Sequence, residues 1–272
     1  MRLAISNIAW AKEYDDQMYA YLQKIGFSGV EIAPTRIFDM PPYEKKEAAR
    51  KWAEEIQEKF GLAVPSIQSI WFQRSENMFQ SVAERNALLA YTKEAIDFAK
   101  ALGSHNLVFG CPRNRNRNDD CLISVTECEA VAEDFFRELG EYALANQTVL
   151  ALEPNPPIYN TNFMNCTAEA FAMAKRVGSA GCKVNIDFGT ILTNEESLDV
   201  LENNMDYVNH IHISEPGLNR IEKRELHKEL SHMIKEADYA GYVSVEMKNQ
   251  EDIVAVQEVC AYVAEVFDRE YI

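Results

Sequence analysis

Basic residues are scarce in this sequence. It has 27 Lys and Arg against 43 Asp and Glu, which gives a formal net charge of −16. A surface this acidic repels nucleic-acid phosphates, so we expect no nucleic-acid partner. Histidine is scarce as well, with 5 in 272 residues. That number excludes any site that needs many imidazole ligands.

The sequence also lacks long apolar runs and paired cysteines. No run approaches the length of a membrane span, and the N-terminal stretch 3–10 (LAISNIAW) is too short and too polar for a signal peptide. The cysteines form no C-x-x-C pair and no framework spacing, which is typical of reduced thiols in a cytosolic protein. They are Cys111, Cys121, Cys128, Cys166, Cys182 and Cys260. We therefore expect a cytoplasmic protein with no membrane partner.

Neither nucleotide-binding loop is present, since no G-x-G-x-x-G follows the first apolar run and no P-loop occurs anywhere. What the chain does contain is a regular alternation of short Val- and Ile-rich runs with longer helical patterns. The runs are 3–10, 29–33, 63–70, 106–110, 148–154, 183–187, 208–214 and 242–247. Eight strand–helix repeats predict an α/β fold, a (β/α)₈ TIM barrel in a single domain over 1–272. An open doubly wound sheet is the alternative.

Four polar side chains end four consecutive predicted strands, and in this barrel class the carboxyl ends of the strands form the active site. Isolated carboxylates are costly to bury, and several of them around one imidazole repel one another. A divalent cation would remove that repulsion, and the donor set suits Mn²⁺, Zn²⁺, Mg²⁺ or Co²⁺. The four residues are Glu153, Asp187, His212 and Glu246. The alternative for any one of them is a helix cap or a loop contact.

The residues two positions before these four would form the next layer of the barrel interior, because strand side chains alternate. They are Ala151, Asn185, His210 and Ser244. Three of them are polar, where a barrel layer normally carries branched apolar side chains. We expect Asn185, His210 and Ser244 to orient the metal ligands. A polar network without metal would have the same layer.

Other polar residues are candidates for contact with a substrate. The run PRNRNR (112–117) places arginines at alternate positions after the fourth strand, and Arg113 and Arg115 could clamp a phosphate or carboxylate. The alternative is a solvated basic loop. The further candidates at the barrel mouth are Glu31, Gln68, Asn155, Glu215 and Lys248.

Several stretches resemble the xylose isomerase-like TIM barrels, specifically the sugar phosphate isomerase/epimerase group, which is related to tagatose 3-epimerase-like enzymes and endonuclease IV. These stretches are GVEIAPTRIF (29–38), LALEPNP (150–156), VNIDFGT (184–190), HIHISEPGL (210–218) and VSVEM (243–247). The resemblance implies that Glu153, Asp187, His212 and Glu246 are the metal ligands. It selects His212, the second histidine of the H-x-H pair, over His210.

The sequence departs from the epimerase-like pattern at two places. Members commonly carry a second histidine three residues after the strand-six Asp, and Thr190 stands there in this chain. They also place an Arg shortly after the strand-seven His, whereas here Arg220 comes later and Glu215 is nearer.

The resemblance implies a divalent-metal-dependent sugar or sugar-phosphate isomerase or epimerase. A metal, with Mn²⁺ the first expectation, would chelate two sugar oxygens and stabilise an enediolate, while Glu153 and Glu246 move the proton. A keto-polyol dehydratase or lyase of the inosose dehydratase kind is the alternative, followed by a non-catalytic sugar-binding barrel. An endonuclease IV-like enzyme needs many more histidines than this chain has. Barrels of the superfamily are often dimers or tetramers, which implies a homo-oligomer.

Overall fold

The computed structural model describes residues 1–117 and 123–267, and their strands form one parallel eight-stranded sheet. The strands are β1 (Arg2–Ser6), β2 (Gly29–Glu31), β3 (Ser66–Ile67), β4 (Asn106–Phe109), β5 (Leu150–Leu152), β6 (Cys182–Asp187), β7 (Val208–Ser214) and β8 (Tyr242–Glu246). The hydrogen-bonded order is β2-β1-β8-β7-β6-β5-β4-β3. Isolated bridges from Gly29 to Ala63 and from Ile32 to Ile67 then join the two edges. The predicted (β/α)₈ barrel is therefore confirmed, and the open doubly wound sheet is excluded.

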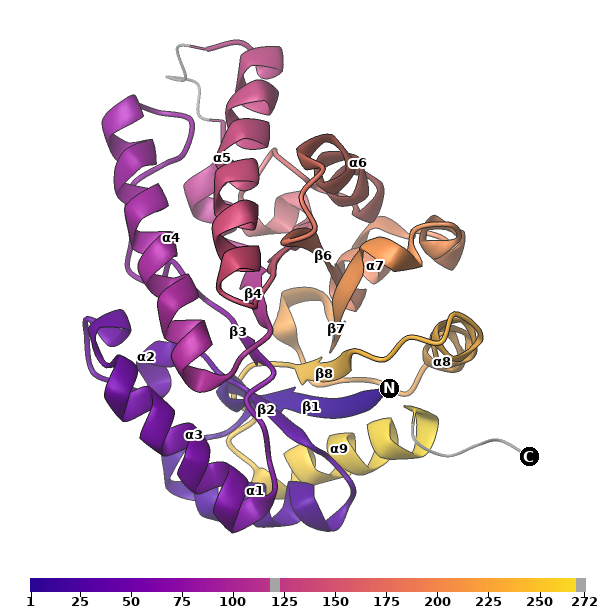
Figure 1. Ribbon diagram of the computed structural model, residues 1–272. Coiled ribbons are helices and arrows are strands. Elements are labelled where there is room, and N and C mark those ends of the chain that lie inside the picture. Colours follow the sequence, from indigo (N-terminus) through magenta and orange to yellow (C-terminus); the bar gives the residue numbers. More distant parts are fainter. Residues whose placement is uncertain (118–122, 268–272) are drawn as a thin grey trace.

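Helices surround the strands on the outside, as Figure 1 shows. They are α1 (Asp15–Lys24), α2 (Pro34–Ile37), α3 (Lys46–Phe60), α4 (Val82–Leu102), α5 (Val125–Ala145), α6 (Thr167–Val177), α7 (Phe188–Asn194), α8 (Glu225–Glu236) and α9 (Ile253–Phe267). The last helix, α9, packs against both α1 and α8 and so completes the ring. Gly61 and Gly103 end α3 and α4 in the left-handed conformation, with φ of 66° and 70°. Glycine adopts that conformation without a Cβ clash.

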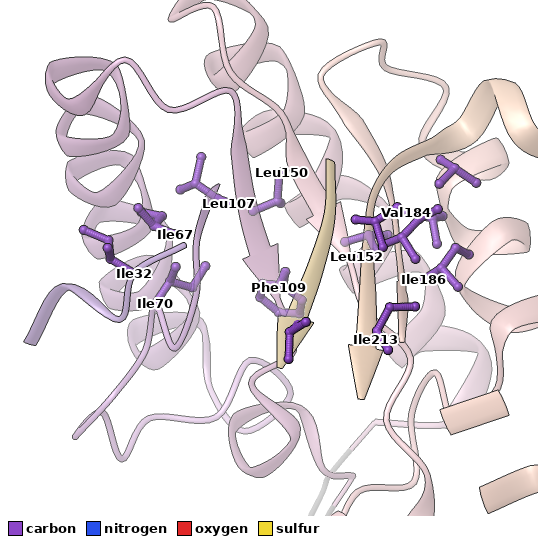
Figure 2. Packing of buried hydrophobic residues seen from close by; sticks show 14 of the residues in the cluster. Ile32, Ile67, Ile70, Leu107, Phe109, Leu150, Leu152, Val184, Ile186 and Ile213 are labelled. Carbon is purple, nitrogen blue, oxygen red and sulfur yellow. The ribbon is translucent and has the colours of Figure 1, made fainter. Parts of the chain in front are cut away.

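The alternation of side chains along the strands separates an apolar layer from a polar interior. On β6, Val184 and Ile186 belong to the buried apolar cluster, which Figure 2 shows together with residues of the neighbouring strands. Because successive side chains point to opposite faces of a sheet, Asn185 and Asp187 point the other way, into the barrel. The fold therefore directs these polar residues toward the barrel axis.

The strand register brings the polar ends of β6, β7 and β8 together. Asp187 is the register partner of His212, while Glu246 pairs with Ser214. His212 itself pairs with Ser244. Barrel strands are tilted relative to the axis, so residues at one height are not all register partners. The ligand candidate on β8, Glu246, therefore lies two residues beyond the register partner of His212.

Helix composition and the cysteine side chains bear on two of the expectations from the sequence. Among residues 1–117 and 123–267, no helix combines the length and apolar character that crossing a bilayer requires. Cys111, Cys166, Cys182 and Cys260 are free thiols. Cys121 lies outside the described residues.

Candidate metal centre

The four side chains at the ends of β5 to β8 converge inside the barrel mouth. Each offers one ligand atom, and these atoms lie within 4.8 Å of one another. All four side chains are buried, and the most exposed, Glu153, has a relative accessibility of 8%. The residues are Glu153, Asp187, His212 and Glu246.

His212 lies at the centre of this group and contacts carboxylates through both ring nitrogens. Its Nδ1 lies 3.0 Å from Glu153 Oε1 and 3.2 Å from Glu246 Oε2. Its Nε2 lies 3.0 Å from Glu31 Oε1. An imidazole that gives one nitrogen to a metal commonly donates the other N–H to a carboxylate, which fixes its tautomer and orientation. If His212 holds a metal, Nδ1, which faces Glu153 and Glu246, would be the ligand atom, and Glu31 would orient the ring.

The sequence predicted Glu31 at the barrel mouth, but in the structure this residue lies deeper in the barrel, beneath His212. It is 0% exposed, and its Oε2 lies 2.9 Å from His210 Nε2. One carboxylate thus joins both histidines of the H-x-H pair. His210 contacts Glu31 and does not reach the four converging ligand atoms, as expected for a residue one layer below them.

Hydroxyl groups hold Asp187 from two sides. Ser214 on β7 donates a hydrogen bond to Asp187 Oδ1. On the other side, Asp187 Oδ2 accepts from the backbone amide of Thr190 at 2.9 Å and lies 2.6 Å from the Thr190 hydroxyl. Asp187 is the N-cap of α7, so the same carboxylate begins that helix. The cap and the ligand roles that the sequence set as alternatives are compatible at this residue.

Side-chain amides donate hydrogen bonds to Glu153, and the backbone of Gly110 lies close to its carboxylate. Asn185 Nδ2 donates to Glu153 Oε1 at 2.7 Å, and Asn155 Nδ2 donates to Oε2 at 3.1 Å. Behind them, Arg115 donates to the Glu153 carbonyl and to Asn155 Oδ1, each at 2.8 Å. A Cβ on Gly110 would come within 2.5 Å of Glu153 Oε2. Only glycine leaves room for the carboxylate here.

The electrostatics of this group favour an added cation. Burial raises the pKa of Asp187, with the nearby Glu153 carboxylate adding to the effect, and burial raises the pKa of Glu246 to about 7. Burial alone would lower the pKa of His212, but Glu31 and Glu246 outweigh it and hold that pKa well above its usual value. Likewise the histidines outweigh burial at Glu31 and hold its pKa well below the usual range. A divalent ion would favour the ionised carboxylates, and three oxygen donors with one imidazole fit it.

A pocket of about 190 Å³ lies over the converging ligands. Glu153, Asp187 and Glu246 form its floor, and Tyr159 and Leu218 belong to the loops that line it. Burial, with Asp187 adding to it, raises the pKa of the Tyr159 phenol to about 12, and its oxygen accepts from the Gly217 amide at 3.0 Å. The phenol is therefore neutral at physiological pH.

Comparison with known proteins identifies the family. A model described as "Xylose isomerase-like TIM barrel" matches residues 19–263. The chain belongs to this family. No curated protein matches the sequence.

Solved structures share the fold of this xylose isomerase-like barrel at low identity. The apo form of the 3-keto-D-glucoside 4-epimerase YcjR from E. coli is 20% identical, with 97% of this chain and 99% of that chain covered and a TM-score of 0.78. A D-psicose 3-epimerase crystallised in the presence of D-fructose is 17% identical, with coverage of 99% and 98% and a TM-score of 0.80. The IolI protein with a binding zinc atom is 15% identical, with coverage of 98% and 96% and a TM-score of 0.71.

Within the xylose isomerase-like barrel, only some of the expected substrate contacts reach the pocket. Gln68 and Asn155 line it. Arg115 is fully buried behind Asn155, and Arg113 is exposed outside the lining. Burial lowers the pKa of Arg115 to about 10, which leaves the guanidinium charged at neutral pH.

The remaining predicted residues lie away from the pocket or beneath it. Glu215 is 2.7 Å from Arg224 in an ion pair, and the exposed Lys248 donates to Asn219 Oδ1 at 2.9 Å. Ser244 is fully buried, and its hydroxyl has no hydrogen-bond partner within the described part of the chain.

The sequence reasoning missed two residues of the site, Ser214 and Tyr159. The alternation of His210 and His212 along β7 continues to Ser214, so period two could have found that residue. No comparable signal marks Tyr159, which lies in a turn at Pro157–Tyr159.

Proposed function

We propose that this chain is a divalent-metal-dependent sugar isomerase or epimerase that removes a proton from a substrate carbon next to a carbonyl and returns it to that carbon or to its neighbour. The observation that carries the proposal is the placement of Glu153 and Glu246, which line one pocket and approach the same imidazole nitrogen. Proton transfer next to a carbonyl needs such positioned acids and bases. The sugar epimerases among the structures of the same fold agree with this chemistry.

The residues that would hold the metal are Glu153, Asp187, His212 and Glu246. When bound, a divalent ion supplies a positive charge that favours negative charge on neighbouring oxygens of the sugar. Mn²⁺ is our first expectation, with Zn²⁺, Mg²⁺ and Co²⁺ as alternatives, and the zinc of the IolI protein keeps Zn²⁺ among them.

The protein's own side chains would carry the proton. Glu153 directly follows β5 and Glu246 ends β8, so the two carboxylates reach the pocket from different strands. One would remove a proton from a sugar carbon, and the other or the same one would return it. Return to the opposite face inverts the carbon, and return to its neighbour isomerises the sugar.

The size of the pocket favours a small substrate. Pockets for drug-sized ligands measure about 300–1,000 Å³, whereas this one measures about 190 Å³. Gln68, Asn155 and Tyr159 add neutral polar groups suited to sugar hydroxyls. A single sugar unit therefore matches the pocket better than an oligosaccharide. The homo-oligomer and the cytoplasmic location stay predictions from the sequence.

Exchange of carbon-bound hydrogen in D₂O tests the proposal. The metal-loaded protein is incubated with a panel of ketoses, their phosphates and inososes, and deuterium at each carbon is followed by NMR. We expect deuterium next to the carbonyl of at least one sugar, and loss of that exchange in Glu153→Gln and Glu246→Gln. Loss of water from an inosose would support the dehydratase alternative. No exchange and no dehydration with any panel member would contradict an enzymatic role.

A further inference from the structure

We infer that the substrate is an uncharged sugar and that a phosphorylated one is rejected. The inference rests on the proposed function, because it concerns the substrate class of the same pocket. It follows from the charges that line the pocket, from the positions of the nearby arginines, and from the backbone amides at the barrel mouth.

The pocket offers negative charge and neutral polar groups. Three carboxylates, those of Glu153, Asp187 and Glu246, form part of the lining, and none of the described residues that line it is Lys or Arg. A phosphate would carry about two negative charges beside these carboxylates, with one metal ion to offset all of them. The neutral amides of Gln68 and Asn155 can instead bind hydroxyl groups. The lining is thus complementary to a polyol.

The arginines that the sequence suggests as an anion clamp do not form one. Arg115 is buried and donates to the Glu153 carbonyl and to Asn155, so it supports the pocket wall from behind. Arg117 donates through Nε to Asn162 Oδ1 at 3.3 Å, and it lines a different depression on the surface. Arg113, between them in the chain, is exposed and absent from the pocket lining.

The usual phosphate position of a β/α barrel is also occupied by internal contacts. That position lies in the loops after the seventh and eighth strands, where backbone amides face the phosphate. Here the Gly217 amide donates to the Tyr159 hydroxyl at 3.0 Å, and the Leu218 amide donates to the Glu215 carbonyl at 2.9 Å. After β8, the Lys248 amide donates to the Leu218 carbonyl at 2.8 Å. These amides already have acceptors and offer no cradle for an anion.

Paired substrates test the inference. Deuterium exchange is measured for D-fructose and D-tagatose and for the 1-phosphate and 6-phosphate of each, with the Mn²⁺-loaded protein. We expect kcat/KM for a free sugar to exceed that for its phosphates at least about a hundredfold. Equal or faster exchange with a phosphate would overturn the inference and leave the proposed function standing. No exchange with any sugar, free or phosphorylated, would reject the proposed function and this inference with it.

Two variants test whether the charge or the size of the phosphate group causes its rejection. Arg113→Ala tests the clamp directly, and we expect an unchanged ratio of free to phosphorylated sugar; a selective loss of phosphate turnover would overturn the inference. Ser69→Arg adds a cation at an exposed position that lines the pocket. We expect it to raise the relative use of the phosphates roughly fivefold, the size expected for one exposed ion pair. An unchanged ratio would show that size excludes the phosphate, and would overturn the argument from charge.

Discussion

Thr190 occupies a position where a histidine is common in the epimerase-like sequences, and here it supports a metal-ligand candidate. Its hydroxyl lies 2.6 Å from Asp187 Oδ2 and 2.9 Å from the carbonyl of Pro154. Both acceptors compete for one hydroxyl proton. A threonine thus connects the end of β6 with the loop after β5, on the side of Asp187 opposite to Ser214.

Replacing Thr190 by valine should weaken metal binding. Thr190→Val keeps the shape of the side chain and removes the hydroxyl, so Asp187 Oδ2 retains only the backbone amide of residue 190. Loss of a group that orients a metal ligand typically costs about 10–100-fold in affinity. We expect a loss in that range for Mn²⁺ or Zn²⁺, measured by competition with a chromophoric chelator.

Thr193→Val is the matched control, because this threonine lies on the same helix and its hydroxyl donates to the Gly189 carbonyl at 2.7 Å. Its metal affinity should stay near that of the wild type. Equal affinity in both variants would show that Thr190 does not support the site.

At this scale the sequence predicted the types and convergence of the site residues better than their depth. Glu153, Asp187, His212 and Glu246 end consecutive strands, and that spacing alone indicated that they would converge. Alternation says which face a residue occupies and leaves its height along the barrel open, so Glu31 was expected at the mouth and lies beneath His212. Arg115 ends a short turn that begins after Cys111, a residue in the left-handed conformation with φ of 44°. The spacing of arginines in the loop does not reveal this conformation, so it could not predict the position of Arg115.

The end of β4 explains why the carboxylate of Glu153 can occupy its place. Gly110 follows the strand directly, and besides Glu153 Oε2 its absent Cβ would meet Asn155 Oδ1 at 3.4 Å. The space between the ends of β4 and β5 therefore holds either a methyl group on residue 110 or the carboxylate of Glu153. The φ of Gly110 lies outside the left-handed region, so alanine fits the backbone there and conflicts only with the site.

Gly110→Ala should displace Glu153 while the barrel persists. A contact of 2.5 Å is not tolerated, so the carboxylate must move. Misplacement of a reacting group by about 1 Å can cost about a hundredfold in rate. We expect deuterium exchange to fall by about that factor, with circular dichroism unchanged and Tm within a few degrees of the wild type. Wild-type exchange in this variant would contradict the placement of Glu153 as an acid or base.

The contact between α8 and α9 contains a buried histidine outside the site. His227 is 0% exposed, its Nδ1 lies 3.0 Å from the Tyr262 hydroxyl, and its ring packs on Phe188 with centroids 4.6 Å apart. Burial, with Arg224 adding to it and Glu215 opposing it, lowers the pKa of His227 to about 4. The neutral imidazole therefore belongs to the folded state.

This histidine should make the fold sensitive to mild acid. Its folded pKa lies below the unfolded value of about 6.5, so its stabilising contribution is full above about pH 6.5 and is lost as the pH falls toward 4. Between pH 7 and 5 the loss from this residue is about 2 kcal/mol. We expect His227→Asn, which cannot take up that proton, to lose about that much less stability over the same interval, measured by urea unfolding. Parallel pH profiles for wild type and variant would contradict the assignment.

For the whole molecule, the number and order of strands followed from the sequence, whereas the details of barrel closure did not. Eight apolar runs between helical patterns predicted the (β/α)₈ barrel, and each run overlaps one strand. The third run spans 63–70 but its strand is only Ser66–Ile67, and its link to β2 consists of isolated bridges. Strand length and stagger depend on closing the ring, which a local pattern does not encode.

Metal binding at the candidate site would stabilise the whole barrel, because the ligands come from several strands. A ligand that binds only the folded state stabilises it by about 2.7 kcal/mol at a hundred times its Kd, or roughly 5–10 °C in Tm for a domain of this size. We expect Mn²⁺ or Zn²⁺ to raise Tm by that amount at pH 8, measured by differential scanning fluorimetry after treatment with EDTA. Asp187→Asn should show almost no increase.

The same shift should depend on pH, because the ligands must be deprotonated to bind. Burial raises the pKa of Glu246 to about 7 in the metal-free protein, and the carboxylates hold that of His212 well above its usual value, so below pH 7 the metal must displace protons from both residues. Displacement of one proton weakens binding about tenfold per pH unit. The increase in Tm should therefore be several degrees smaller at pH 6 than at pH 8. An equal increase in Tm at pH 6 and pH 8 would mean that the metal binds elsewhere, and so would a wild-type increase in Asp187→Asn. Among the described residues, only one group of candidate ligands contains both Asp187 and Glu246.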